Sequence, residues 1–358
     1  MTQPEQALAS ILRNGARALA GYAASETPPL DTDAAQAAAP VQFGGWQNVL
    51  AARLEELAVA VSTGQPDFFV DQVRWTQTAL TARGVSPASL RARLEGLRRV
   101  LTEQIPAELA PLAIAQIDRA LAGFDGEPAG LGPRLTADTA EQRLAAKYLV
   151  AVLEGDRREA SRLILKAADE GQSVSELYLQ VLQPAQEELG RMWVLGEINV
   201  AEEHFATTTT RLVMAQIHAK AICGPSNGKT LVAAAVAGNQ HDLGIQMVAD
   251  LFELDGWRTI QLGANIPAED LAQAVEFYEA DLVALSVSLA TQLPILEEAI
   301  SAVRASERGR KVKILVGGCG LATISEMAKL SSADGLAASA VEAVKLGNAL
   351  VGLPKTET

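Results

Sequence analysis

Apolar positions in residues 1–222 recur at the three- to four-residue spacing of amphipathic helices. Ser86 and Pro87 mark one helix start, because serine caps a helix and proline suits its first position. No segment here alternates apolar and polar residues as a half-buried strand does. This part is therefore predicted to be helical, and the clearest helices are expected at 46–61, 67–82, 87–101, 107–124, 138–153, 157–169, 173–193 and 201–222.

The pattern changes after Thr230. Leu231–Val236 is a continuous apolar run, which is typical of a strand buried on both faces. Such runs alternate with helical segments, an order that predicts a parallel, doubly wound sheet with ligands bound at the carboxyl ends of its strands. The other strands are expected at 259–262, 282–287 and 313–316, and the helices near 244–255, 268–279, 293–307 and 321–330.

Glycine and proline mark the boundaries between domains. Residues 125–133 (DGEPAGLGP) contain three glycines and two prolines, which indicates a linker. Short turns at Gly155 and Gly171 favour antiparallel neighbouring helices. The expected fold combines all-helical and α/β parts: a helical domain at 1–132, a four-helix bundle at 133–225 and a Rossmann-like domain at 226–358.

Composition excludes several classes of function. The 43 acidic and 30 basic residues give a net charge of −13, whereas neutralising nucleic-acid phosphates requires a basic face. Two cysteines cannot form a disulfide framework, and no apolar run approaches the length of a membrane span. We expect a cytoplasmic protein that binds neither nucleic acid nor membrane, and no enzymatic motif is apparent.

Three short motifs follow expected strands. The first strand is followed by Gly238–Gly244, a segment that contains His241. Forty-one residues separate Gly244 from Ser286–Ser288, and 28 residues separate Ser288 from the pair Gly317 and Gly318. A lone histidine is most often an ordinary loop residue. Here all three motifs are expected at one edge of the sheet.

These motifs resemble the cobalamin-binding domains of methionine synthase, the mutases and related sensors, which carry Asp-x-His-x-x-Gly, Ser-x-Leu and Gly-Gly at this spacing. The resemblance implies that His241 binds cobalt from below and that Ser286 hydrogen-bonds the displaced benzimidazole. Glycines then leave room for the tail of the cofactor. The cofactor-binding residues that it implies are Asn239, Gln240, His241, Asp242, Leu243, Gly244, Gly263, Ser286, Val287, Ser288, Gly317, Gly318 and Gly335.

Two positions depart from that family's pattern. Asn239 stands where the family has aspartate, so the expected hydrogen-bond acceptor behind the histidine is neutral. Ser288 stands where the family has leucine. Neither change removes the cobalt ligand.

A second signature lies in the expected bundle. Trp193 is followed by nine residues and then by Glu203 and His204, a spacing similar to that of adenosylcobalamin photoreceptors of the CarH type. That resemblance implies that all three side chains contact the adenosyl group. The photoreceptors have a histidine directly after the tryptophan, and here Val194 occupies that position. The alternative is a core tryptophan beside an ordinary helix start.

The N-terminal region resembles the non-haem globin sensor domains of the RsbR type, through 67–75 and 83–85. A domain of this kind joined to a cobalamin module is similar to the photocobilins, which implies biliverdin as a second cofactor. No cysteine precedes Cys223, so the bilin would be held non-covalently. The candidate bilin contacts are Trp46, Arg74, Trp75, Arg91 and Arg98, whose alternative roles are helical core and solvated face.

The sequence therefore predicts a light sensor that binds adenosylcobalamin, with light-dependent assembly of a homo-oligomer and a signalling partner that the sequence does not identify. Two alternatives remain. One is a corrinoid methyl carrier, which needs open space above cobalt for its partner enzymes. The other is a cobalamin sensor that does not respond to light.

Overall fold

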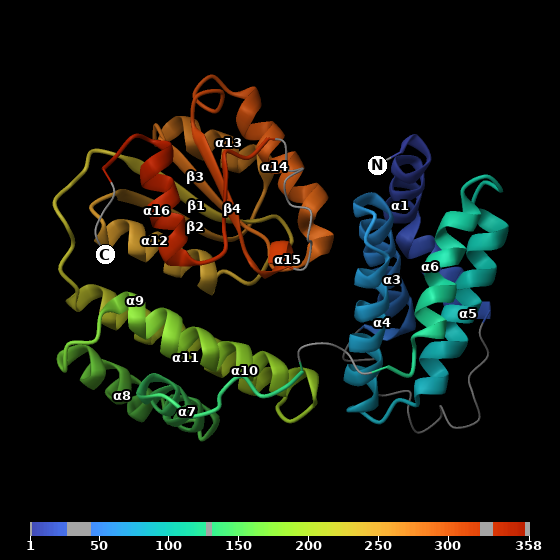
Figure 1. The fold of residues 1–358 in the computed structure, drawn as a ribbon, viewed down its shortest axis with the longest axis horizontal. Coiled ribbons are helices and arrows are strands. Elements are labelled where there is room, and N and C mark those ends of the chain that lie inside the picture. Colours follow the sequence, from blue (N-terminus) through green and yellow to red (C-terminus); the bar gives the residue numbers. More distant parts are fainter. Residues whose placement is uncertain (1, 27–43, 127–130, 323–331, 355–358) are drawn as a thin grey trace. The chain divides into compact units, whose positions relative to one another are not determined.

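The computed structural model describes residues 2–26, 44–126, 131–322 and 332–354 (Figure 1). Parts of the expected linker and of the helix expected at 321–330 lie outside these ranges. The chain forms two compact units. The first contains residues 1–133 and 190–200, and the second contains 134–189 and 201–358.

Among its described residues, five helices of the first unit enclose one apolar core, as the helical spacing predicted. Ser86 caps α5 through its hydroxyl, which accepts from the backbone N–H of Ala88, and Pro87 is the first helical residue. The core contains side chains from every helix, among them Leu12, Leu54 and Phe69. The helices are α1 (Gln3–Glu26), α3 (Gly45–Thr63), α4 (Pro66–Thr81), α5 (Pro87–Gln104) and α6 (Ala110–Ala122).

A buried ion pair lies between α3 and α4. Arg53 pairs with Glu56 and also donates to the hydroxyl of Thr76, and all three residues are less than a tenth exposed. Burial and the neighbouring Glu56 charge raise the pKa of Glu55. The arrangement neutralises the Arg53 guanidinium inside the helical core.

Glu56→Ala is expected to destabilise the first unit by about 3–5 kcal/mol, because it leaves the Arg53 charge buried without its partner. Amide hydrogen exchange of α3 and α4 measures the effect. Asp118→Ala is the control, since the Asp118–Arg98 pair is exposed and worth about 1 kcal/mol or less. Equal exchange rates in the two variants would contradict the importance of the buried pair.

The cap, residues 134–220, contains the helices expected before the sheet. Thr139, Asp156 and Ser173 cap three of them through their side chains, and Glu176 completes a capping box with Ser173. The segment expected as a single helix at 173–193 is interrupted by a π-helical turn at Leu177–Leu182. The cap helices are α7 (Ala140–Leu153), α8 (Arg157–Asp169), α9 (Val174–Glu176), α10 (Gln183–Val194) and α11 (Val200–Lys220).

The sheet is parallel throughout, in the order β2-β1-β3-β4-β5. This order confirms the predicted doubly wound fold. It places the switch in strand order between β1 and β3, where ligands bind in sheets of this kind. The strands are β1 (Thr230–Val236), β2 (Arg258–Ile266), β3 (Leu282–Ser286), β4 (Lys313–Gly317) and β5 (Gly335–Ala337).

Both edge strands are unusual. β2 is longer than expected, and its register against β1 shifts twice, at Ala233/Ala234 and at Ala234/Val236. β5 has three residues and was not predicted, because so short a strand shows no period.

Helices cover both faces of the sheet. α12 and α16 pack on one face, and α13 and α14 on the other (Figure 1). Within the described ranges, no helix combines the length and apolarity needed to cross a bilayer. The helical elements are α12 (Leu243–Leu254), α13 (Ala268–Phe277), a 3-10 turn (Ala290–Gln292), α14 (Leu293–Ala305), α15 (Cys319–Ala322) and α16 (Ala340–Leu350).

Candidate functional site

The loop after β1 is fixed by the buried side chain of Asn239. Its amide Nδ2 donates to the carbonyl oxygen of Ser286 at 3.1 Å, and its Oδ1 accepts from the backbone N–H of His241 at 3.1 Å. Asn265 at the end of β2 accepts from the N–H of Gly238 and donates its own N–H to the carbonyl of Asn239. Asn239 thus holds the backbone of His241, whereas the sequence suggested a contact with its ring.

The His241 side chain lies at the carboxyl edge of the sheet and is exposed. Its imidazole makes no hydrogen bond within the part of the chain that the structure describes. Both ring nitrogens are therefore available on a backbone that is already in place. Such an imidazole is a suitable metal ligand.

Ser286, at the end of β3, offers a second unused polar group. The residue is 8% exposed, and its hydroxyl has no hydrogen-bond partner among the described residues. The hydroxyl lies 3.1 Å from the point where a Cβ on Gly318 would stand. The hydroxyl oxygen is not fully enclosed, so solvent or a ligand can reach it.

Glycines allow the loops after β3 and β4 to approach closely. Gly318 has φ +109°, and a Cβ there would lie 2.1 Å from the carbonyl oxygen of Val287. Gly320 is packed in the same way against the backbone of Leu289. By contrast, a Cβ on Gly244 would meet nothing within 4 Å, so the chain leaves open space beside the first turn of α12.

The other residues implied by the cobalamin resemblance are more dispersed. Gln240 is exposed, Val287 is fully buried, and Ser288 and Leu289 donate their N–H groups to the buried amide of Gln292. Leu243 is half-buried at the start of α12, and Gly263 lies in β2 with φ +85°. Gly335 begins β5, where a Cβ would lie 2.7 Å from the side chain of Leu346.

An ion pair joins the cap to the loop that carries His241. Both guanidinium nitrogens NH1 and NH2 of Arg211 on α11 donate to the Asp242 carboxylate, at 2.9 and 2.7 Å. Asp242 is 7% exposed and precedes α12 without capping it through its side chain. The cap is thus attached directly beside the candidate cobalt ligand. Sequence motifs did not indicate Arg211, because its partner lies in another domain.

A second contact between the cap and α12 lies farther along that helix. The buried Tyr178 hydroxyl, in the π-helical turn, donates to Oδ2 of Asp250 at 2.6 Å. Burial, with Asp250 beside it, raises the pKa of Tyr178 well above its ordinary value. Burial also raises the pKa of Asp250, an effect that Glu253 reinforces, whereas the Tyr178 hydrogen bond and His218 oppose it.

Asp250→Asn is expected to increase stability at neutral pH. Because the pKa of Asp250 is raised on folding, the carboxyl favours the folded state at acid pH, and that contribution is lost as pH rises through the folded pKa. Asparagine keeps an acceptor for Tyr178 and cannot ionise. Thermal unfolding between about pH 4 and 8 should show an advantage for the variant that grows with pH. A constant difference across this range would contradict the prediction.

The two parts of the Trp-x9-Glu-His signature belong to different units. Trp193, in the first unit, is half-buried, and Arg83 donates to the carbonyl oxygens of Trp193 and Val194 while its guanidinium lies 5.0 Å from the indole centroid. Glu203 and His204 lie in the first turn of α11, in the second unit. They are joined by a 2.7 Å contact between Glu203 Oε2 and His204 Nδ1.

The arginines proposed for a bilin already have partners. Arg74 donates to the carbonyl of Gly123 and contacts Asp71, Arg91 contacts Asp125, and Arg98 pairs with Asp118. Trp46 is packed against the core and lies under the buried Arg93, whose guanidinium is 3.9 Å from the indole centroid. Trp75 is half-buried.

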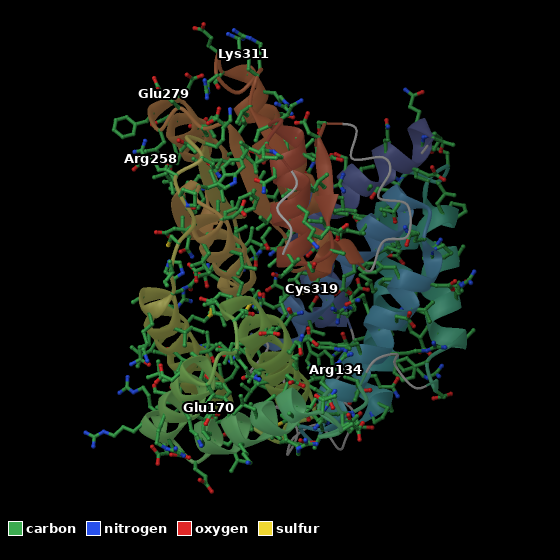
Figure 2. All side chains as sticks on the ribbon, turned by 60° about the vertical axis from the view of Figure 1, so that its left-hand side comes forward. Arg134, Glu170, Arg258, Glu279, Lys311 and Cys319 are labelled. Atoms are coloured by element: carbon green, nitrogen blue, oxygen red, sulfur yellow. The ribbon has the colours of Figure 1, made fainter. Side chains whose placement is uncertain are left out.

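The carboxyl ends of the strands, where the cobalamin motifs lie, form the end of the sheet that is nearer the cap. Figure 2 shows Cys319, two residues after β4, on this side, whereas Lys311, before β4, lies at the opposite end. Among the described residues, no three His, Cys, Asp or Glu side chains gather as a metal site. His241 remains the candidate metal ligand at this edge of the sheet.

Comparison with known proteins agrees with this geometry. Residues 229–345 match a family described as B12 binding domain, and residues 144–218 match a second family with that description. The fold and site therefore define a cobalamin-binding protein, in which a helical cap and a Rossmann-like sheet form the binding module.

Its relatives fall into two groups. The chain is 28% identical over 207 residues to corrinoid protein DSY3155 of Desulfitobacterium hafniense, an alignment that covers 56% of this chain and 94% of that protein. It is 27% identical over 238 residues to the HTH-type transcriptional repressor CarH of Myxococcus xanthus, covering 63% of this chain and 74% of that protein. The monomethylamine corrinoid protein of Methanosarcina barkeri shares the fold, with a TM-score of 0.52, 18% identity and coverage of 60% of this chain and 100% of that one.

Proposed function

We propose that the protein is a light sensor that binds adenosylcobalamin between its cap and its sheet. The observation that supports this most is the Trp193, Glu203 and His204 signature, present together with the cobalamin motif in one chain. The alignment with CarH covers 63% of this chain. This combination favours a covered upper face with an adenosyl group beneath it.

The proposal assigns a contact with the cofactor to residues of both the sheet edge and the cap. His241 would hold cobalt through one imidazole nitrogen, and the Ser286 hydroxyl would donate to the benzimidazole tail of the cofactor. Glu203, His204 and Trp193 contact the upper group. When bound, adenosylcobalamin supplies a cobalt–carbon bond that visible light breaks. Loss of the upper group would remove a packing partner of Trp193, Glu203 and His204, and subunit assembly would change as a result.

The N-terminal unit extends the proposal to a second chromophore. The resemblance of residues 67–85 to globin-like sensor domains supports a non-covalent biliverdin there, with Trp46 and Trp75 as candidate ring contacts. The arginines would have to exchange their present carboxylate partners for propionates. The signal would pass to other proteins in the cytoplasm through a change in assembly or through a partner protein, without a catalytic or DNA-binding activity of this chain.

A corrinoid methyl carrier is the second candidate. It is favoured by the alignment with corrinoid protein DSY3155, which extends over nearly all of that protein. In a carrier, the upper face must stay accessible to partner enzymes. Trp193→Ala would then have little effect on cofactor choice, whereas in the sensor it should abolish the preference for an adenosyl group.

Absorption spectra before and after illumination test the proposal. The protein is expressed with cobalamin and biliverdin supplied, and its size is measured in parallel by light scattering. A photobleaching adenosylcobalamin band with a changed assembly supports the sensor, and a red band adds the bilin. A photostable corrinoid with unchanged assembly would contradict the light sensor and favour the carrier or a cobalamin sensor that does not respond to light.

A further inference from the structure

We propose that a chain of polar contacts inside the cap, which ends in the hydrogen bond from Thr207 to Glu203, orients Glu203 and thereby determines which nitrogen of His204 carries the proton. Its members are Tyr148, Thr210, Gln186 and Thr207, which we assign as positioning residues. The part of this inference that concerns adenosylcobalamin rests on the proposed function. The part that concerns the histidine does not.

The outer end of the chain is the pair at the start of α11. His204 Nδ1 lies 2.7 Å from Glu203 Oε2, and the His204 side chain is 73% exposed. An ionised carboxylate can only accept a hydrogen bond, so Nδ1 must donate. In the neutral ring Nε2 then has no proton, and an acceptor is presented to whatever binds over the cap.

Thr207 holds the other oxygen of the carboxylate. Thr207 lies one helical turn after Glu203 on α11, and its hydroxyl donates to Oε1 of Glu203 at 2.7 Å. The same hydroxyl lies 3.4 Å from Oε1 of Gln186 on α10. Because its single proton goes to Glu203, this longer approach is a polar contact and not a second full hydrogen bond. With each oxygen engaged by a different donor, the plane of the Glu203 carboxylate is defined.

The inner end lies in the core of the cap. Gln186 Nε2 donates to Oγ1 of Thr210 at 2.6 Å, and the Tyr148 hydroxyl lies 2.8 Å from that same oxygen. Thr210 donates to the carbonyl oxygen of Ala206, so Tyr148 must be the donor toward Thr210. Burial raises the pKa of Tyr148 to about 12, which keeps its hydroxyl protonated at neutral pH.

The position of this chain argues against a purely structural role. Residues 203, 207 and 210 lie on one face of α11, where helices in bundles ordinarily present apolar side chains. A buried polar network needs every member satisfied and often stabilises no more than apolar packing would. This network connects three helices, and it ends at an exposed carboxylate–imidazole pair. Orientation of that pair is the role that the contacts support.

The four consecutive threonines at 207–210 allow a matched test. Thr207→Val and Thr210→Val interrupt the chain. Thr208→Val is the control on the exposed side, and Thr209→Val is the control for a buried threonine, since its hydroxyl has no partner among the described residues. Tyr148→Phe tests the inner end while keeping the shape of the ring.

The measurement is the nitrogen NMR spectrum of the cofactor-free protein at about pH 8.5, roughly two pH units above the reference pKa of the free imidazole. The chain has three histidines, so His204 is assigned with single variants of the other two. Wild type and both controls should show His204 protonated at Nδ1. Thr207→Val should show a mixture of tautomers, with smaller shifts in Thr210→Val and Tyr148→Phe. An unchanged tautomer in all three would overturn the proposal.

Cofactor affinity separates this inference from the proposed function. Losing a hydrogen bond to a charged group should lower adenosylcobalamin affinity about tenfold in Thr207→Val, with methylcobalamin affinity unchanged. A changed tautomer with both affinities unchanged supports the positioning chain and contradicts the role of the pair in binding the adenosyl group. A tenfold loss for adenosylcobalamin alone supports both.

Discussion

His241→Ala is expected to remove the protein ligand from cobalt. Bound cobalamin should show the absorption of a form without an axial nitrogen. Its affinity should fall by at least the roughly 10- to 100-fold that loss of a group behind a metal ligand costs, because His241 is assigned as the ligand itself. The reason lies in the geometry: the ring is exposed without a partner among the described residues, on a backbone held by Asn239. Ultraviolet–visible titration with hydroxocobalamin and adenosylcobalamin measures both quantities.

A rescue experiment and a control variant show whether the effect is specific to the His241 imidazole. Free imidazole should restore the nitrogen-ligated spectrum in His241→Ala, because the space left by the ring opens to solvent. His218→Gln is the control, since His218 lies near the end of α11 beside Glu253. An unchanged spectrum in His241→Ala would remove His241 from the ligand role and leave the sheet edge without its proposed metal contact.

Gly318→Ala is expected to destabilise the sheet domain strongly. Its φ of +109° is unfavourable for any residue with a Cβ, and that atom would lie 2.1 Å from the carbonyl oxygen of Val287. Strain of this kind costs about 1–3 kcal/mol before the clash is relieved, so we expect a total loss of about 3 kcal/mol. Thermal unfolding of the cofactor-free protein measures it.

Gly244→Ala is the matched variant for that experiment. Nothing lies within 4 Å of a Cβ at Gly244, so the cofactor-free protein should be as stable as wild type. Cobalamin affinity should nevertheless fall, because the added methyl group occupies space that the bound cofactor needs. If Gly244→Ala binds cobalamin with unchanged affinity, the open space beside α12 is not part of the site.

Local signals predicted most of the fold. The Ser86 cap defined the start of α5, and the apolar runs placed β1 and β3 within a residue or two of their observed bounds. The π-helical turn at Leu177–Leu182 was not predicted, because its residues have the same apolar spacing as an ordinary helix. β5 and α16 were not predicted either, since β5 depends on pairing with β4.

The site was predictable only in part. The spacing of the motifs placed His241, Ser286 and Gly318 at one edge of the sheet, because parallel strands align their carboxyl ends. The contacts that hold this edge come from long-range packing. Arg211 reaches Asp242 from the cap, and Gln292 joins two loops, and neither residue belongs to a recognisable motif.

Solvated and paired arginines cannot be distinguished from sequence. Arg91 and Arg98 form one helix face, yet their carboxylate partners, Asp125 and Asp118, come from the region of the next helix. The buried Arg93 lies on Trp46, and helical spacing alone does not separate it from its exposed neighbours.

The two edges of the sheet limit how copies of this protein can associate. An open strand edge is a template for backbone pairing with another chain, which can lead to aggregation. Here one edge is the three-residue β5, and the other is β2, whose register shifts interrupt a regular row of donors and acceptors. The shortness of β5 and the register shifts of β2 both disfavour addition of a further strand. For the assembly that the proposed function requires, we therefore expect contacts through helical surfaces, which can form and separate without rearranging the sheet.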